Sequence, residues 1–179
     1  MNMNSPGSFN IILLTGAFVL FFSCQPPVQE PGPSKTEQIK ENLIKINRYL
    51  VSKDSAFIEK LIAEKKWQMK KTPAGLWYEI DPRGHGEKIT AGKEVTIAYR
   101  ITLPDGTLCY SSDSLGLKKF VAGKGDVESG LEQGILLMRK GDRARFILPP
   151  HLAYGLTGDQ NKIGPRTIII YEVEVLEVK

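Results

Sequence analysis

One stretch of nine residues constrains the fold more than any other part of the sequence. Between Val95 and Leu103, large apolar side chains occupy every second position, and polar or small ones lie between them. Successive side chains of an extended strand point to opposite faces of a sheet. The period of two therefore predicts a strand with one face in a core and the other toward solvent.

The same period recurs on both sides of this stretch. The turn-forming residues Pro73-Ala-Gly75 precede an apolar segment at 76–80, and Pro104-Asp-Gly106 predicts a turn into an antiparallel strand at 108–110. Residues 143–148 and 167–178 alternate again, each with one apolar face. These two faces consist of Ala144, Phe146 and Leu148, and of Ile169, Tyr171, Val173 and Val175.

One helix is predicted between these strands. Leu131, Ile135 and Met138 have the spacing of a single helix face, and Gly141 is expected as the C′ residue that ends the helix. Several antiparallel strands with one helix covering one face make an α+β domain. We expect this domain to span residues 72–179.

Several short motifs occur in a fixed order within this region. They are Val95-Thr-Ile-Ala-Tyr99 with Asp105-Gly106, Ser111-Ser112, Gly130-Leu-Glu132, Met138-x-x-Gly141, Leu152-Ala-Tyr-Gly155 and Ile163-Gly-Pro165. Taken together, they resemble the FKBP-type peptidyl-prolyl isomerases over residues 72–179. The helical segment before the domain, the Leu76-Trp-Tyr78 motif and the loop at 156–159 most resemble the gliding-motility-associated lipoprotein branch of that family.

The resemblance implies a half-open antiparallel β-sheet wrapped around one short α-helix, with a ligand pocket between helix and sheet. The catalytic pocket would consist of Tyr99, Phe120, Leu131, Tyr154 and Tyr171. The other substrate-binding residues would be Cys109, Tyr110, Val127, Glu128 and Ile163. Leu131 would lie beneath the proline ring, and the Tyr154 hydroxyl would donate a hydrogen bond to a substrate carbonyl. The backbone around Val127 and Glu128 would pair with the extended peptide.

Such a pocket is expected to need no metal, cofactor or nucleophile. Rotation about a peptide bond has to break amide resonance, a barrier of about 18–20 kcal/mol. The twisted transition state has less charge separation than the planar amide, so an apolar, water-poor pocket binds it relatively better. The expected partners are proline-containing polypeptides, and the expected role is to assist the folding of exported proteins.

Five positions depart from the family pattern. They are Leu131 in place of a tryptophan, Tyr110 in place of a carboxylate, Cys109 and Lys118 in place of aromatic residues, and Glu128 in place of an apolar residue. A leucine buries less area than an indole, and a glutamate brings charge to a site that benefits from being dry. The alternative function is a membrane-anchored binding module or chaperone with weak or no isomerase activity.

Residues 35–70 have a helical period instead. Ser34 and Glu37 have the spacing of a capping box. An apolar stripe follows, made of Ile39, Leu43, Ile46 and Leu50. Residues 52–55 include good N-cap types, so we expect two short helices, at about 35–51 and 55–68. The stripe must be covered by the main domain, by the other helix, or by a second copy of the chain in a homodimer.

The first 34 residues predict a targeting signal and a lipid attachment site. Residues 11–22 are apolar or small, which is too short for a bilayer span of about 20 residues but fits a signal-peptide h-region. Ser23 and Cys24 follow directly and resemble the lipobox of bacterial lipoproteins. We expect a signal peptide at 1–23, a lipidated Cys24, a proline-rich linker at 24–34, and a membrane-anchored lipoprotein in the cell envelope that faces the periplasm or lies on the outer-membrane surface. A plain signal peptide or an uncleaved anchor is the alternative.

Charge and motif content exclude several other classes. The net charge of +4 arises at 35–71, where ten Lys and Arg face five Asp and Glu, whereas 72–179 holds fourteen of each. No basic patch with aromatic partners is evident, so we expect no nucleic-acid partner. Two histidines and two cysteines make no zinc cluster. The hydrolase, dinucleotide-binding and zincin motifs G-x-S-x-G, G-x-G-x-x-G and H-E-x-x-H do not occur.

Overall fold

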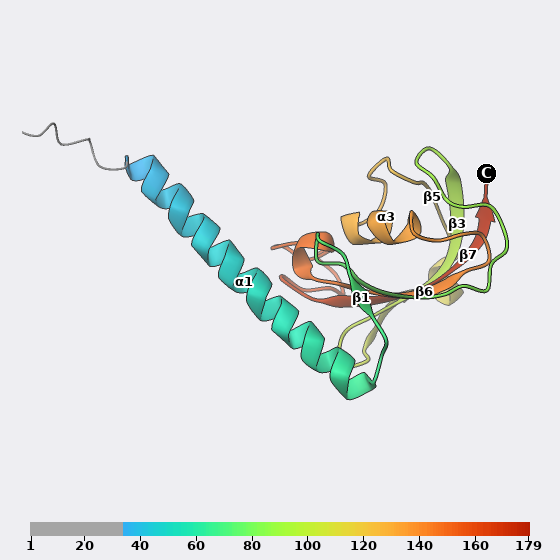
Figure 1. Cartoon of the computed structure of the whole chain (residues 1–179), viewed down its shortest axis with the longest axis horizontal. Coiled ribbons are helices and arrows are strands. Elements are labelled where there is room, and N and C mark those ends of the chain that lie inside the picture. The colour runs from blue at the N-terminus through green and yellow to red at the C-terminus, as the bar shows by residue number, and fades with distance from the viewer. Residues whose placement is uncertain (1–33) are drawn as a thin grey trace, which may run out of the picture.

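The computed structural model describes residues 34–179, so the predicted signal peptide, Cys24 and nearly all of the linker lie outside the described residues. Figure 1 shows a curved sheet with helices on both of its faces. The strands are β1 (Lys70–Lys71), β2 (Trp77–Asp81), β3 (Glu94–Thr102), β4 (Leu108–Ser111), β5 (Lys118–Val121), β6 (Arg143–Leu148) and β7 (Ile169–Val178). The helices are α1 (Lys35–Lys65), α2 (Ser112–Leu115), α3 (Ser129–Ile135) and a 3₁₀ turn at Pro150–Leu152.

The sheet is antiparallel throughout its described pairings, in the order β1-β2-β6-β7-β3-β4, and β5 also pairs with β3. Its concave face wraps around α3, as Figure 1 shows. The inward side chains of β3, β6 and β7 form one core with the helix. The predicted half-open sheet around a short helix is confirmed, while β5 was not expected as a strand.

The helix α3 is shorter than its apolar spacing predicts. It ends at Ile135, and the chain continues through tight turns that still carry Met138 into the core. Gly141 is therefore not its C′ residue. It lies in the turn before β6 with φ +93°, and its N–H donates to the Val175 carbonyl at 2.8 Å. Gly134 packs so closely on Phe146 that a Cβ would lie 2.6 Å from the ring, and this contact holds α3 against the sheet.

The prediction of two short helices is wrong, because α1 is one helix of 31 residues. The capping box is present, with the Glu37 N–H donating to the Ser34 hydroxyl and the Ser34 N–H donating to the Glu37 carboxylate. Asp54 does not cap a new helix, because its carboxylate accepts both hydrogen bonds of an ion pair with Arg166. The Ser55 hydroxyl accepts from Lys71. These side chains point outward to tertiary partners, so the backbone passes through the polar run without a break.

The C-terminal part of α1 packs on the convex face of the sheet. Ile58 and Leu61 are buried against Ile147 of β6 and Ile170 of β7. Partly buried apolar side chains surround this second core, namely Ile62, Trp67, Met69, Trp77 and Ile168. The helix therefore covers the sheet face opposite to α3.

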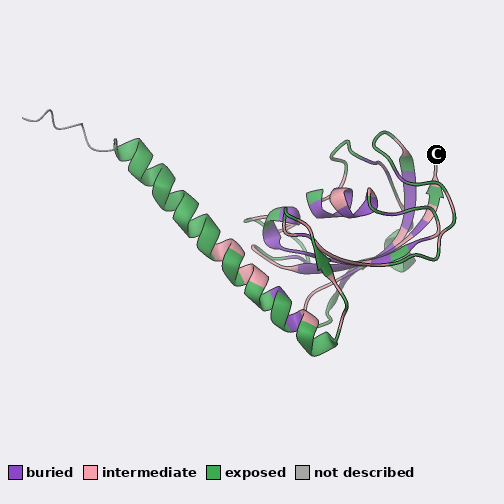
Figure 2. Ribbon diagram, viewed as in Figure 1, coloured by how far each residue is buried: buried purple, intermediate pink, exposed green. Residues whose placement is uncertain are grey.

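The N-terminal half of α1 projects away from the domain and is exposed along its length (Figure 2). Ile39, Leu43 and Ile46 are 51%, 60% and 55% exposed. The main domain thus does not cover this part of the stripe, and no second short helix folds back on it within residues 34–179. In that same range, no helix combines the length and apolarity needed to cross a bilayer.

Candidate active site

Two tyrosines from neighbouring strands form the base of the candidate site. Tyr99 of β3 and Tyr171 of β7 both point to the concave face, and their ring centroids lie 6.3 Å apart. Lys118 of β5 reaches over both rings, with its ammonium 5.0 Å from the Tyr99 centroid. The same ammonium donates to the Tyr171 hydroxyl at 3.1 Å. The family pattern has an aromatic side chain at position 118. In this chain Lys118 instead places a cation over the rings of Tyr99 and Tyr171.

A buried carboxylate connects these groups. Glu128 lies directly before α3, and its side chain is only 8% exposed. It accepts hydrogen bonds from the hydroxyls of Tyr154 and Tyr171, the latter at 3.0 Å. The Lys118 ammonium lies 3.9 Å from the same carboxylate. A chain of polar contacts thus runs through a site expected to be mainly apolar.

The phenols of the site keep their protons at neutral pH. Burial, together with the hydrogen bond and the charge of Glu128, raises the pKa of Tyr154 well above its ordinary value. Burial and the Glu128 charge do the same to the pKa of Tyr171, and to a smaller extent to the pKa of Tyr99. The Tyr154 and Tyr171 hydroxyls therefore donate hydrogen bonds, both to Glu128.

The opposite wall comes from β4 and the loop at 155–166. The Tyr110 hydroxyl donates to Asp159, whose other oxygen accepts the N–H groups of Asn161 and Ile163 at 2.9 and 2.8 Å. The family pattern has a carboxylate at position 110, where this chain has a tyrosine. The loop supplies the Asp159 carboxylate beside that tyrosine. Burial and the charge of Asp159 raise the pKa of the buried Cys109 thiol, so Cys109 is a packing residue of this wall.

A cavity of about 300 Å³ lies between these walls. Its lining consists of Tyr99, Ile101, Tyr110, Leu115, Lys118, Tyr154, Asp159 and Asn161. Three of the sequence-predicted site residues are in that lining, and Glu128 and Tyr171 bond to it. Phe120, Leu131 and Ile163 belong to the core, with Val127 packed at its edge. The structure thus collects the tyrosines and Glu128 around one cavity and places Leu131 beneath the surface.

Sequence reasoning missed Ile101, Leu115, Asp159 and Asn161 as lining residues, and noted Lys118 only as a departure from the family. For Asp159 a local signal exists. An aspartate side chain commonly bonds the backbone two residues on, and Asp159 stands two residues before Asn161. For Ile101 the alternation of β3 is a local signal, because it places Ile101 on the same face as Tyr99. For Leu115 no local signal exists, because its role follows from how α2 meets the cavity.

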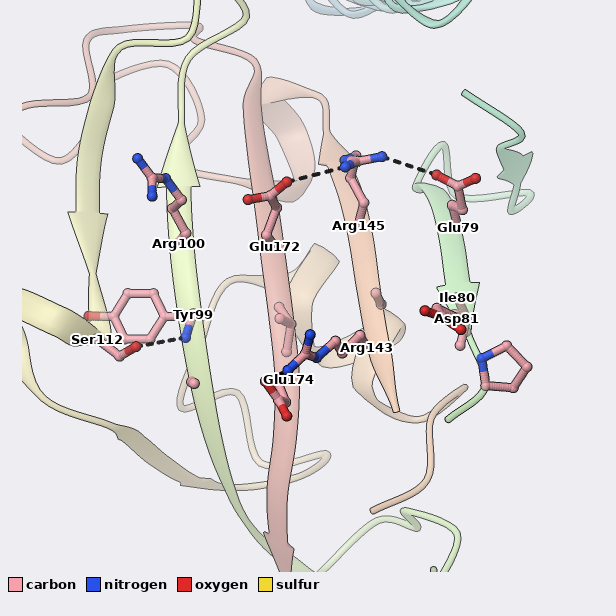
Figure 3. Close-up of a pocket in the computed structure, with 14 residues that line it drawn as sticks. Glu79, Ile80, Asp81, Tyr99, Arg100, Ser112, Arg143, Arg145, Glu172 and Glu174 are labelled. Atoms are coloured by element: carbon pink, nitrogen blue, oxygen red, sulfur yellow. Dashed lines mark hydrogen bonds and ion pairs between the residues drawn. The ribbon is translucent and has the colours of Figure 1, made fainter. Parts of the chain in front are cut away.

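A larger groove of about 780 Å³ lies on the convex face (Figure 3). Charged side chains from adjacent strands line it in rows. Arg145 bridges Glu79 and Glu172 at 3.1 and 3.2 Å, and Arg143 pairs with Glu174 at 2.8 Å. Cross-strand pairs of this kind fit a solvated sheet face, where they add modestly to stability. The carboxylates and guanidinium groups of these rows mostly satisfy one another, so the concave cavity is the better candidate site.

Comparison with known proteins identifies the family. A profile of the FKBP-type peptidyl-prolyl cis-trans isomerases matches residues 85–176, more than half of the chain. The chain belongs to this family. The match includes all ten predicted residues of the FKBP-type pocket. Within residues 34–179, no group of three or more His, Cys, Asp or Glu side chains is placed to hold a metal ion.

The similarity to curated proteins extends beyond residues 85–176 of this chain. A macrophage infectivity potentiator of Trypanosoma cruzi is 31% identical over 162 residues, which cover 90% of this chain and 79% of that protein. FkpA of Buchnera aphidicola is 35% identical over 149 residues, or 81% of this chain and 58% of the relative. The chain thus spans less than two thirds of that FkpA.

The solved FKBP structures agree on the fold. The crystal structure of FkpA from Escherichia coli superposes with a TM-score of 0.59 at 27% identity, covering 84% of this chain and 75% of that one. The crystal structure of AtFKBP13 gives a TM-score of 0.60 at 27% identity, covering 63% of this chain and 99% of that one. The FkpA superposition covers a larger share of this chain than the AtFKBP13 superposition does.

The Asp159 contacts predict a specific pH dependence of stability. Burial raises the pKa of Asp159, but the hydrogen bonds from Tyr110, Ile163 and Asn161 outweigh it, so the net shift is downward. A carboxyl with a lowered pKa in the folded state stabilises the fold above its unfolded pKa, about 3.9, and that contribution is lost as the pH falls through the folded pKa. In Asp159→Asn, the free energy of unfolding in urea should fall less steeply from about pH 5 to pH 3 than in the parent. Asp113→Asn, at an exposed position, is the control, and an Asp159→Asn slope equal to the parent's would contradict the prediction.

Proposed function

We propose that this chain is a peptidyl-prolyl cis-trans isomerase that accelerates X-Pro rotation in the concave cavity and assists the folding of exported proteins. The observation that carries the proposal is a cavity lined by protonated phenols within an FKBP-type domain. X-Pro bonds exchange in roughly 10–100 s without help, so the reaction is slow enough for catalysis to matter.

The chemistry asks only for differential binding. The twisted transition state carries less charge separation than the planar amide, so surroundings poor in water favour it. Leu131, Phe120 and Tyr171 supply the apolar surface under the substrate, and the Tyr154 hydroxyl supplies the donor to a substrate carbonyl. No group of the chain has to form a covalent bond to the peptide.

A second candidate function is a binding module with weak or no isomerase activity. It is favoured by the charge of Glu128 in the pocket and by Leu131 in place of the larger floor residue of the family. The exposed apolar half of α1 offers such a module a surface for unfolded polypeptides. The two functions differ in whether X-Pro exchange depends on Tyr154.

Isomerisation of a Leu-Pro peptide, followed by NMR exchange, separates these functions. Tyr154→Phe should lower kcat/KM by about tenfold, since one hydrogen bond of roughly 1.4 kcal/mol is lost in the transition state. Tyr49→Phe, on the exposed part of α1, is the matched control and should match the parent. An inert parent with an active Leu131→Trp would favour the binding module, and a folded set without any activity would reject the pocket.

We also propose that α1 forms a homodimer. Its apolar stripe has the spacing of a coiled-coil seam, with steps of four, three and four from the exposed Ile39, Leu43 and Ile46 to the half-buried Leu50. Phe57, 48% exposed, continues the same seam. A second copy of α1 would cover side chains that the domain leaves in solvent.

Sedimentation equilibrium tests the dimer. Ile46→Glu places a charge in the seam and should weaken self-association by about a hundredfold, since a buried unpaired charge is costly. Lys45→Glu introduces the same residue one position away, outside the seam, and should self-associate like the parent. A parent that stays monomeric at all concentrations would contradict the dimer.

For localisation, we propose a lipoprotein anchored through Cys24 in the cell envelope, with proline-containing exported or outer-membrane proteins as clients. The support is the run at 11–22 followed by Ser23-Cys24, together with the likeness to the gliding-motility-associated branch. Two or more acyl chains hold a protein stably on a membrane. Mass spectrometry of the mature N-terminus should find acyl groups on Cys24, and Cys24→Ser should move to the soluble fraction. An unmodified Cys24 would refute the anchor.

A further inference from the structure

We propose that Glu128 is a built-in occupant of the substrate pocket. In the free protein its carboxylate takes the Tyr154 hydroxyl that a substrate carbonyl needs, and a substrate binds only when the carboxylate leaves. The inference rests on the proposed isomerase function and concerns what limits it. It makes Glu128 a residue that determines affinity for the peptide.

The position of Glu128 on its own helix gives its side chain no structural task there. Glu128 is the N-cap residue of α3, with φ −56° and ψ 139°, but its carboxylate makes no capping hydrogen bond. Its backbone carbonyl alone begins the helix, by accepting the Glu132 N–H at 3.0 Å. A carboxylate at a helix N-terminus would ordinarily bond the first free N–H groups. Here it points instead to the hydroxyls of Tyr154 and Tyr171.

Every polar partner of this carboxylate belongs to the pocket. Tyr154 donates to one oxygen and Tyr171 to the other, from two separate elements of the fold. Lys118 of β5 adds its charge at 3.9 Å and also bonds Tyr171. Since a buried charge is unfavourable unless it is paired and hydrogen-bonded, this network stabilises the carboxylate in the pocket. A ligand therefore has to replace contacts that the free protein already makes.

The apolar surface meant for a proline ring is covered in this arrangement. Leu131 and Tyr171 are fully buried, and neither they nor Phe120 line the cavity of about 300 Å³. The carboxylate bridges Tyr154 to Tyr171 beside this surface. Rotation of the Glu128 side chain breaks both phenol contacts at once, and it needs no change in α3, which Glu128 joins through its backbone alone. That rotation would open the pocket.

Two substitutions at Glu128 test the occupant in the full chain. Glu128→Val removes the acceptor, and Glu128→Gln keeps the shape but removes the charge. The probe is a Leu-Pro peptide, whose Kd is measured by NMR titration and whose kcat and KM are measured by NMR exchange. We expect Glu128→Val to lower Kd and KM by about tenfold, because a hydrogen bond to a charged group no longer has to be broken. Glu128→Gln should lie between Glu128→Val and the parent.

A fall in Kd and KM distinguishes an occupant from a structural residue, because loss of a structural contact would not tighten peptide binding. Glu94→Val, an exposed site at the start of β3, is the matched control and should equal the parent. An active parent with unchanged or weaker binding in Glu128→Val overturns the occupant and leaves the isomerase intact. If Glu128→Val does not fold, the KM of Glu128→Gln decides, and it must fall below the parent's. If neither the parent nor a folded variant binds or acts on the peptide, both proposals are overturned.

Discussion

The structure depends on one strand, β7, that contributes side chains to both hydrophobic cores. Strand β7 pairs with β6 on one side and β3 on the other. Its inward side chains, among them Tyr171 and Val173, build the core under α3, while Ile170 points the other way and anchors α1. A shift of one residue in its register would exchange these sets, so the pocket and the helix both rely on the same pairing.

Much of the fold could be predicted because its main signal is local. A period of two in β3, β6 and β7 reports a half-buried strand whatever its neighbours are. The break predicted in α1 fails for the opposite reason. Residues 52–55 have capping side chains, but Asp54 bonds Arg166, which lies 112 positions along the chain. The prediction that Gly141 ends α3 fails for a similar reason, since its positive φ belongs to a turn before β6.

The candidate site could likewise be predicted only where the signal is in the sequence itself. The family resemblance predicted the tyrosines and Glu128 as members of one pocket, but not how they bond to one another. The contact between Glu128 and Tyr154 joins residues 26 positions apart, and the one with Tyr171 spans 43. Such pairs form only when the sheet has closed around α3. An unexpected charge in a pocket is therefore visible in a sequence, whereas the donors that stabilise it are visible only in the fold.

The helix and the pocket are connected through the loop at 155–166. Arg166 has a left-handed backbone, with φ +52°, and its guanidinium donates to both oxygens of Asp54 on α1. Its N–H donates to Gly155, which closes the loop that carries Asp159 against Tyr110. One wall of the cavity is thus fastened directly to α1. Ile58 and Leu61 fix that helix on the convex face, so the Arg166–Asp54 ion pair ties this wall of the cavity to a helix that the sheet already holds in place.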